Sequence, residues 1–155
     1  MKKLLILLSL LLASAAALAG DPPYDEKADA KAELQQTLAA ARQGHQPVLL
    51  ILGANWCEDC RALDEALKKG KSAELLAREF KVVKVDVGNF DHNLDIDAEY
   101  GHPIGKGIPA AVVLSPDNQV IYATRAGELA DARRMSETGI YEFFERVSRL
   151  GRTSQ

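Results

Sequence analysis

Basic residues are not in excess in this chain. It has 19 Lys and Arg against 22 Asp and Glu, a formal net charge of −3, and no long run of Lys or Arg. Nucleic acids and anionic membrane surfaces are bound mainly through clustered positive charge. We therefore expect neither as a partner.

Long apolar runs are equally scarce, and the one in the chain covers residues 4–19. It is short for a bilayer span, which needs about 20 residues. Lys2 and Lys3 precede it, and its last three residues form an Ala-Leu-Ala cleavage site, so it has the three parts of a secretory signal. We expect residues 1–19 to be a signal peptide cleaved after Ala19. The mature protein would then be periplasmic, without stable membrane insertion; an uncleaved N-terminal membrane anchor is the alternative.

Cysteine is also scarce, because the chain has only Cys57 and Cys60. A small exported scaffold held together by disulfides would need several pairs. The residues after the signal peptide are numerous enough to bury a core of their own, in one domain of ordinary size. Stapling the fold is therefore not the main role of this pair.

Apolar spacing predicts a mixed α/β order for the rest of the chain. Short apolar runs without a polar face are typical of strands buried on both sides, and spacings of three and four residues are typical of amphipathic helices. The first strand–helix–strand unit should be parallel, and the last two strands should form an antiparallel hairpin on the same sheet. The expected helices cover 25–43, 57–69, 72–80 and 137–150, with a helical turn near Ala98, and the expected strands cover 48–53, 81–88, 110–114 and 119–124.

The two cysteines stand in the sequence Asn-Trp-Cys-Glu-Asp-Cys, after an expected strand and at the start of an expected helix. There, free backbone N–H groups and the positive end of the helix dipole favour a thiolate at Cys57. Cys60 follows at i+3, close enough for a short disulfide. We expect Cys57 to be the exposed nucleophile and Cys60 the shielded sulfur that resolves a mixed disulfide.

Two other interpretations of the pair stay open. Tetrahedral zinc takes four ligands, and the chain has no second cysteine pair, so a zinc site is not expected. His45, His92 and His102 are distant from the pair in sequence, although one of them could complete a copper site. An inert structural disulfide is the second interpretation, but a four-residue loop constrains the unfolded chain little.

The sequence around the pair carries a family resemblance. Residues 48–61, Val-Leu-Leu-Ile-Leu-Gly-Ala-Asn-Trp-Cys-Glu-Asp-Cys-Arg, resemble the active-site segment of the thioredoxin family. Residues 105–114, Gly-Lys-Gly-Ile-Pro-Ala-Ala-Val-Val-Leu, resemble its second signature, and the chain is most similar to exported bacterial thioredoxin-like proteins. The resemblance implies a thioredoxin-like α/β fold over residues 45–150, a central mixed sheet with helices on both faces. Residues 20–44 are then an N-terminal helical segment and residues 151–155 a C-terminal tail.

The resemblance also implies roles for individual residues. Cys57 would be the attacking cysteine and Cys60 the resolving one. Pro109 would follow a cis peptide bond and face the disulfide. X-Pro is the only common place for a cis bond. Ile108 would offer backbone hydrogen bonds to an extended substrate peptide, and Trp56 would flank the site.

Two departures from the family pattern bear on the chemistry. Thioredoxins have a buried acid in the strand before the motif, and Ile51 occupies that position here. Glu58 and Asp59 replace the usual Gly-Pro between the cysteines, and no histidine is there to stabilise a thiolate. Each negative charge costs a nearby thiolate about 1 kcal/mol in solvent, which Arg61 would offset in part. Because the Cys57 thiolate is less stabilised, we expect a more reducing couple.

These features predict a periplasmic thiol–disulfide oxidoreductase that reduces protein disulfides through Cys57 and Cys60, with no metal and no cofactor besides that disulfide. Its expected partners are protein thiol or disulfide substrates and an upstream redox protein that recharges the cysteines. The alternative is a binding module that presents the pair to copper or to a partner protein without turnover. An isomerase is not favoured, because no second dimerisation domain is evident in the sequence.

Overall fold

The computed structural model describes residues 21–153, so the expected signal peptide lies outside the described residues. Its helices are α1 (Ala30–Gly44), α2 (Glu58–Leu67), α3 (Gly70–Glu79), α4 (Leu94–Glu99) and α5 (Glu137–Thr153), with 3-10 turns at Pro103–Lys106 and Ala132–Arg134. Its strands are β1 (Val48–Gly53), β2 (Lys81–Asp86), β3 (Ala110–Leu114) and β4 (Val120–Ala123). None of the described helices is long and apolar enough to cross a membrane.

The four strands form one sheet in the order β2-β1-β3-β4. β1 pairs with β2 in parallel and with β3 in the antiparallel direction, and β3 and β4 form an antiparallel hairpin. The mixed sheet, its parallel first unit and its hairpin are therefore confirmed. β1 is central, and all six of its residues are buried.

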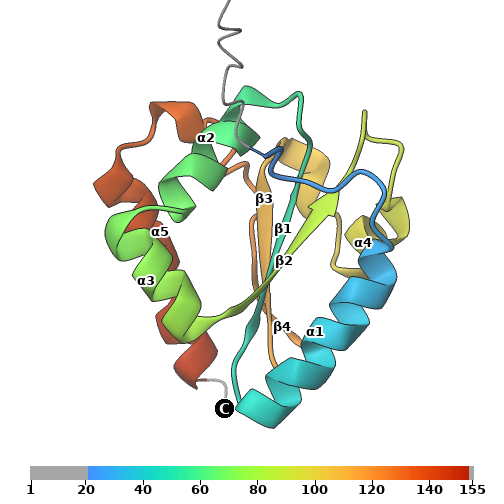
Figure 1. Ribbon diagram of the computed structural model, residues 1–155, viewed down its shortest axis with the longest axis vertical. Helices are drawn as coiled ribbons and strands as arrows, with labels where there is room; N and C mark the ends of the chain where they lie inside the picture. The colour runs from blue at the N-terminus through green and yellow to red at the C-terminus, as the bar shows by residue number, and fades with distance from the viewer. Residues whose placement is uncertain (1–20, 154–155) are drawn as a thin grey trace, which may run out of the picture.

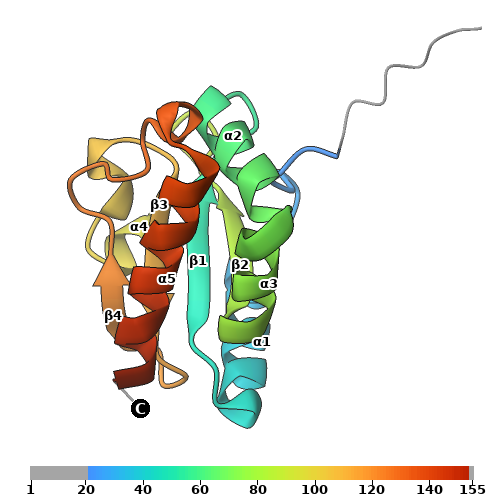
Figure 2. The ribbon, with the colours of Figure 1, turned by 90° about the vertical axis from the view of Figure 1, so that its left-hand side faces the viewer.

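Helices cover both faces of the sheet, as the sequence predicted. Figure 1 shows α2, α3 and α5 on one face and α1 and α4 on the other, and Figure 2 shows the same layers from the side. Side chains from β1 alternate between the two cores, because successive residues of a strand point to opposite faces. Val48, Leu50 and Leu52 belong to the core under α1 and α4. Leu49 and Ile51 belong to the core under α2, α3 and α5.

Element ends differ from the expected ones by a few residues. α1 begins at Ala30 rather than at 25, because the Asp29 side chain accepts a hydrogen bond from the Ala32 N–H at 3.0 Å and caps the helix. α3 begins at Gly70, two residues early, with a positive φ of 49° that glycine adopts readily. α5 continues to Thr153, three residues past the expected end.

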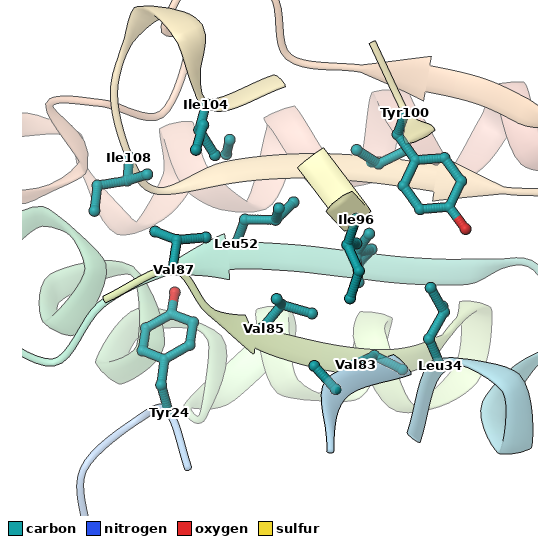
Figure 3. Close-up of a cluster of buried hydrophobic side chains, with 14 of the residues drawn as sticks. Tyr24, Leu34, Leu52, Val83, Val85, Val87, Ile96, Tyr100, Ile104 and Ile108 are labelled. Carbon is teal, nitrogen blue, oxygen red and sulfur yellow. The ribbon is translucent and has the colours of Figure 1, made fainter. Parts of the chain in front are cut away.

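Residues 21–29, which we term the N-terminal strap, lead from the first described residue to α1. Tyr24 in this strap is buried, with 2 % of its surface exposed, and packs in the core under α1 and α4. Figure 3 shows its ring beside the end of β2, with the hydroxyl pointing toward Val87. The strap therefore contributes to the core although it precedes the first helix.

A threonine holds the start of β3, which follows directly on Ile108 and Pro109. Thr124 is buried, and its hydroxyl accepts a hydrogen bond from the Ala111 N–H at 3.0 Å. The Thr124 N–H donates in turn to the Ala111 carbonyl at 2.9 Å. This pair fixes the strand end next to the loop that carries Pro109.

Replacing Thr124 with Val keeps the side-chain volume but leaves the Ala111 N–H without its acceptor. We expect Thr124→Val to lower the free energy of unfolding by about 1–3 kcal/mol, the cost of an unsatisfied buried donor, measured by urea titration. Thr138→Val, at an exposed position of α5, is the control and should change it by less than about 0.5 kcal/mol. Equal effects of the two substitutions would contradict this role of Thr124.

Candidate redox site

The loop between β1 and α2 positions both cysteines. Cys57 is the N-cap of α2, with extended backbone angles of φ −75° and ψ 115°, and its sulfur accepts a hydrogen bond from the Cys60 N–H at 3.1 Å. The two residues form a disulfide across a Cα–Cα distance of 5.2 Å. The expected placement of Cys57 at a helix N-terminus is confirmed, and free N–H groups there favour a thiolate.

The two cysteines differ less in exposure than the sequence predicted. Cys57 is 6 % exposed and Cys60 is 1 % exposed, so both are buried and the first is only slightly more accessible. The difference arises because the segment before β3 lies against the disulfide. The Ile108 carbonyl oxygen is 3.6 Å from the Cys57 sulfur, and the peptide bond between Ile108 and Pro109 is cis. The fold thus brings Ile108 and Pro109 of the second signature to the cysteine pair.

Trp56 lies on the surface beside the pair, 54 % exposed. Its indole N–H donates to the Gly88 carbonyl at 2.8 Å, and its ring meets the edge of Phe90 at a centroid distance of 6.1 Å. Phe90 is itself 44 % exposed. Trp56 therefore extends next to Cys57 as an exposed aromatic surface shared with a residue that the sequence did not single out.

The acidic pair between the cysteines is bound by an arginine from a distant segment. The Arg133 guanidinium donates to the Glu58 carboxylate, and the Arg133 backbone N–H donates to Asp59 at 3.0 Å. Arg61, the cation that we expected to offset these acids in part, donates to the Asn55 carbonyl at 2.7 Å. Sequence reasoning missed Arg133, because 75 residues separate it from Glu58 and no motif marks it.

A buried carboxylate lies under α2 although β1 has none. Ile51 is buried in the apolar core, and Lys84 of β2 is its partner in the strand register. Asp64 of α2, 6 % exposed, forms ion pairs with Lys84 and with Lys68. β1 thus contributes no carboxylate here, and the buried acid lies on α2, one helix turn beyond Cys60, where the helical pattern gave no signal for it.

The N-terminal strap reaches the far side of the pair. A β-carbon added to Gly53 would lie 2.2 Å from the Tyr24 hydroxyl oxygen and 2.8 Å from the Cys60 sulfur. Those two atoms are therefore no farther apart than the sum of these distances, and only glycine leaves room between them. Asn55 holds the strap, since its side chain accepts from the Tyr24 N–H at 3.0 Å and donates to the Tyr24 carbonyl at 2.9 Å.

Metal ligands do not gather at the pair within residues 21–153. No group of three or more His, Cys, Asp or Glu side chains in that range is placed to hold a metal ion. His92 contacts Asp91 at 2.8 Å, and His102 contacts Asp97 at 2.9 Å. These two imidazoles are therefore engaged with neighbouring carboxylates.

Comparison with known proteins gives a family and several similar structures. A family model described as thioredoxin-like matches residues 29–116. The crystal structure of a disulphide isomerase from Xylella fastidiosa Temecula1 is 54 % identical with a TM-score of 0.80, covering 81 % of this chain and 96 % of that one. Comparison with curated proteins gave no match.

Two more distant structures share the fold. A thioredoxin from Thermus thermophilus is 17 % identical with a TM-score of 0.57, covering 76 % of this chain and 85 % of its own. The reduced C-terminal domain of DsbD from Neisseria meningitidis is 19 % identical with a TM-score of 0.56, covering 75 % and 95 %. Together with the sheet topology and the cap at Cys57, the matches lead to one conclusion. This chain belongs to the thioredoxin-like family, and its Cys57–Cys60 pair is of the thiol–disulfide oxidoreductase type.

Proposed function

We propose that this protein is a periplasmic oxidoreductase that reduces disulfides in other proteins. The position of Cys57 carries the proposal. Its sulfur caps α2, accepts the Cys60 N–H at 3.1 Å and lies 3.6 Å from the Ile108 carbonyl. A thiolate at this place is stabilised by the helix N-terminus, and a peptide lying along Ile108 would meet it.

The reaction proceeds in two exchanges. The Cys57 thiolate attacks one sulfur of the substrate disulfide, a bond to Cys57 forms, and the other substrate sulfur leaves with the electron pair and takes up a proton. The Cys60 thiolate then attacks Cys57, the Cys57–Cys60 bond forms, and the second substrate sulfur leaves as a thiol. Two electrons pass to the substrate, and an upstream dithiol protein must return them to the disulfide.

The charges around the pair support the reducing direction. Glu58 and Asp59 bring two negative charges to the first turn of α2, and Arg133 brings one positive charge to both. Arg133 pairs with both acids but carries one positive charge against their two, and no histidine stands between the cysteines. A reduced form with a weakly stabilised thiolate gives up its electrons more readily.

The exposed surface next to Cys57 supports a protein substrate. Trp56 and Phe90 lie exposed beside the pair, and Ile108 and Pro109 border it on the other side. An extended chain carrying a disulfide could pack its apolar side chains on the rings while its backbone meets Ile108. The signal-like residues 1–19 support export to the periplasm, with an N-terminal membrane anchor as the alternative.

Disulfide isomerisation is a second candidate, favoured by the 54 % identical protein described as a disulphide isomerase. Reduction needs Cys60 to release the substrate, whereas isomerisation needs only Cys57 to attack and leave again. Cys60→Ser therefore separates the two. It should abolish insulin reduction in either case, and refolding of scrambled ribonuclease would survive the substitution only if the protein is an isomerase.

Cys60→Ser should also trap substrates, because the mixed disulfide on Cys57 then has no resolving thiol. We expect disulfide-linked adducts with exported proteins in a periplasmic extract, detected by non-reducing electrophoresis and mass spectrometry. Cys57→Ser is the control and should form none. A variant that traps nothing, with tight Cu(I) binding by the wild type, would favour the binding module and contradict the proposal.

Arg133→Ala should make the couple more reducing, because the acids between the cysteines lose their positive partner. We expect the midpoint potential to fall by about 10–20 mV, which corresponds to about 0.5–1 kcal/mol for two electrons at this solvent-exposed ion pair. Glutathione redox titration measures it. Arg134→Ala removes the same charge from the neighbouring exposed position and serves as the control. Equal shifts for the two variants, or a rise for Arg133→Ala, would contradict the assigned contact.

A further inference from the structure

A buried tyrosine that has no part in the exchange steps described above lies close to Cys60. The Tyr24 hydroxyl oxygen and the Cys60 sulfur flank the same point above Gly53, at 2.2 Å and 2.8 Å. Tyr24 is 2 % exposed and Cys60 is 1 % exposed, so water has little access to either. A thiolate formed at Cys60 would therefore depend on protein groups for its stabilisation.

The hydroxyl is held in place from two sides. Asn55, two residues before Cys57, makes a pair of hydrogen bonds with the Tyr24 backbone, at 3.0 Å and 2.9 Å. The Tyr24 ring packs in the apolar core with Val87, as Figure 3 shows. A donor fixed in this way loses little freedom when it bonds to an anion.

Burial and two nearby carboxylates keep the Tyr24 hydroxyl protonated. Burial raises the pKa of Tyr24 above its usual value, and the carboxylates of Asp64 and Asp86 raise it further. Asp64 comes from α2 and is paired with Lys84 and Lys68, whereas Asp86 comes from the end of β2 and accepts from the Gly88 N–H at 3.0 Å. Tyr24 is therefore a hydrogen-bond donor throughout the working pH range and does not itself take a proton.

We propose that Tyr24 is a positioning residue for the resolving step, in which its hydroxyl donates a hydrogen bond to the Cys60 thiolate. The inference rests on the proposed function. Cys60 loses its proton before the attack, which balances the proton that the leaving substrate sulfur takes up, and its thiolate attacks Cys57 in the mixed disulfide. The Cys57–Cys60 bond forms, the bond to the substrate breaks, and the substrate sulfur leaves with the electron pair and is protonated by solvent. Tyr24 keeps its proton from beginning to end.

Single-turnover kinetics with dithiobisnitrobenzoate, an aryl disulfide that releases a coloured thiolate, test this role. The reduced protein should release one coloured thiolate when Cys57 attacks and a second when Cys60 resolves. We expect Tyr24→Phe to slow the second phase about tenfold, the scale of one hydrogen bond to a charged group, and to leave the first unchanged. The pH at which the second phase reaches half its maximal rate should move upward.

Two further variants serve as controls. Tyr100→Phe removes another buried hydroxyl of the same core, bonded to Asn118 at 2.9 Å, and should leave both phases unchanged. Tyr24→fluorotyrosine keeps a hydroxyl donor and should restore the second phase, which a purely structural role of the ring would not require.

The outcomes separate the two proposals. A wild-type protein that releases only one coloured thiolate overturns the proposed function itself. If the wild type shows both phases, the proposed function is retained. The role of Tyr24 is then overturned if Tyr24→Phe has the wild-type rates, or if it slows both phases alike.

Discussion

The cap that the Cys57 sulfur makes on α2 is the contact on which the rest of the site depends. It requires a strand to end and a helix to begin within a few residues, and the fully buried β1 followed by the acidic first turn of α2 provides this. The same loop carries Asn55, which ties the N-terminal strap to the site. The cap also aims the Cys57 sulfur at the segment of Ile108 and Pro109. The first turn of α2, the Ile108 carbonyl and the Cys60 N–H thus all lie against one atom, the Cys57 sulfur.

The charged groups near the disulfide form two sets, one on the surface and one buried beneath it. On the surface, Glu58 and Asp59 are held by Arg133, so they act as part of an ion-pair network rather than as two free charges. Below the surface, Asp64 pairs with Lys84 in the space where β1 contributes only Ile51. The Tyr24 hydroxyl lies beside Cys60 and is the neutral donor that we propose for its thiolate. In the function that we propose, the outer charges would influence the potential at Cys57, and Tyr24 would act in the second exchange at Cys60.

Much of the fold followed from local patterns. The buried runs at 48–53 and 110–114 are strands with the expected ends, because apolar runs of that length have few other ways to be buried. The cysteine pair and the Ile-Pro signature were visible as contiguous motifs. The similar burial of Cys57 and Cys60 was not, because it arises from packing of the 108–109 segment.

The missed residues share one physical property. Tyr24 lies 31 residues from Asn55, and Arg133 lies 75 residues from Glu58, so neither has a spacing that marks it. In the sequence, Arg133 looks like a surface residue and Tyr24 like any other aromatic residue. Only the tertiary structure brings them to the loop between β1 and α2. Asp64 is similar, since an acid on a helix is typical of a solvated face and only the sheet beneath it makes the carboxylate a buried partner of Lys84.

The equilibrium potential of the Cys57–Cys60 couple tests the central claim most directly. Titration of the purified mature protein against glutathione, with the fraction of dithiol read by alkylation and mass spectrometry, gives it in one experiment. We predict a value below about −200 mV, in the range of reducing members of the fold. A value near about −120 mV, typical of strong oxidases, would contradict the reducing direction.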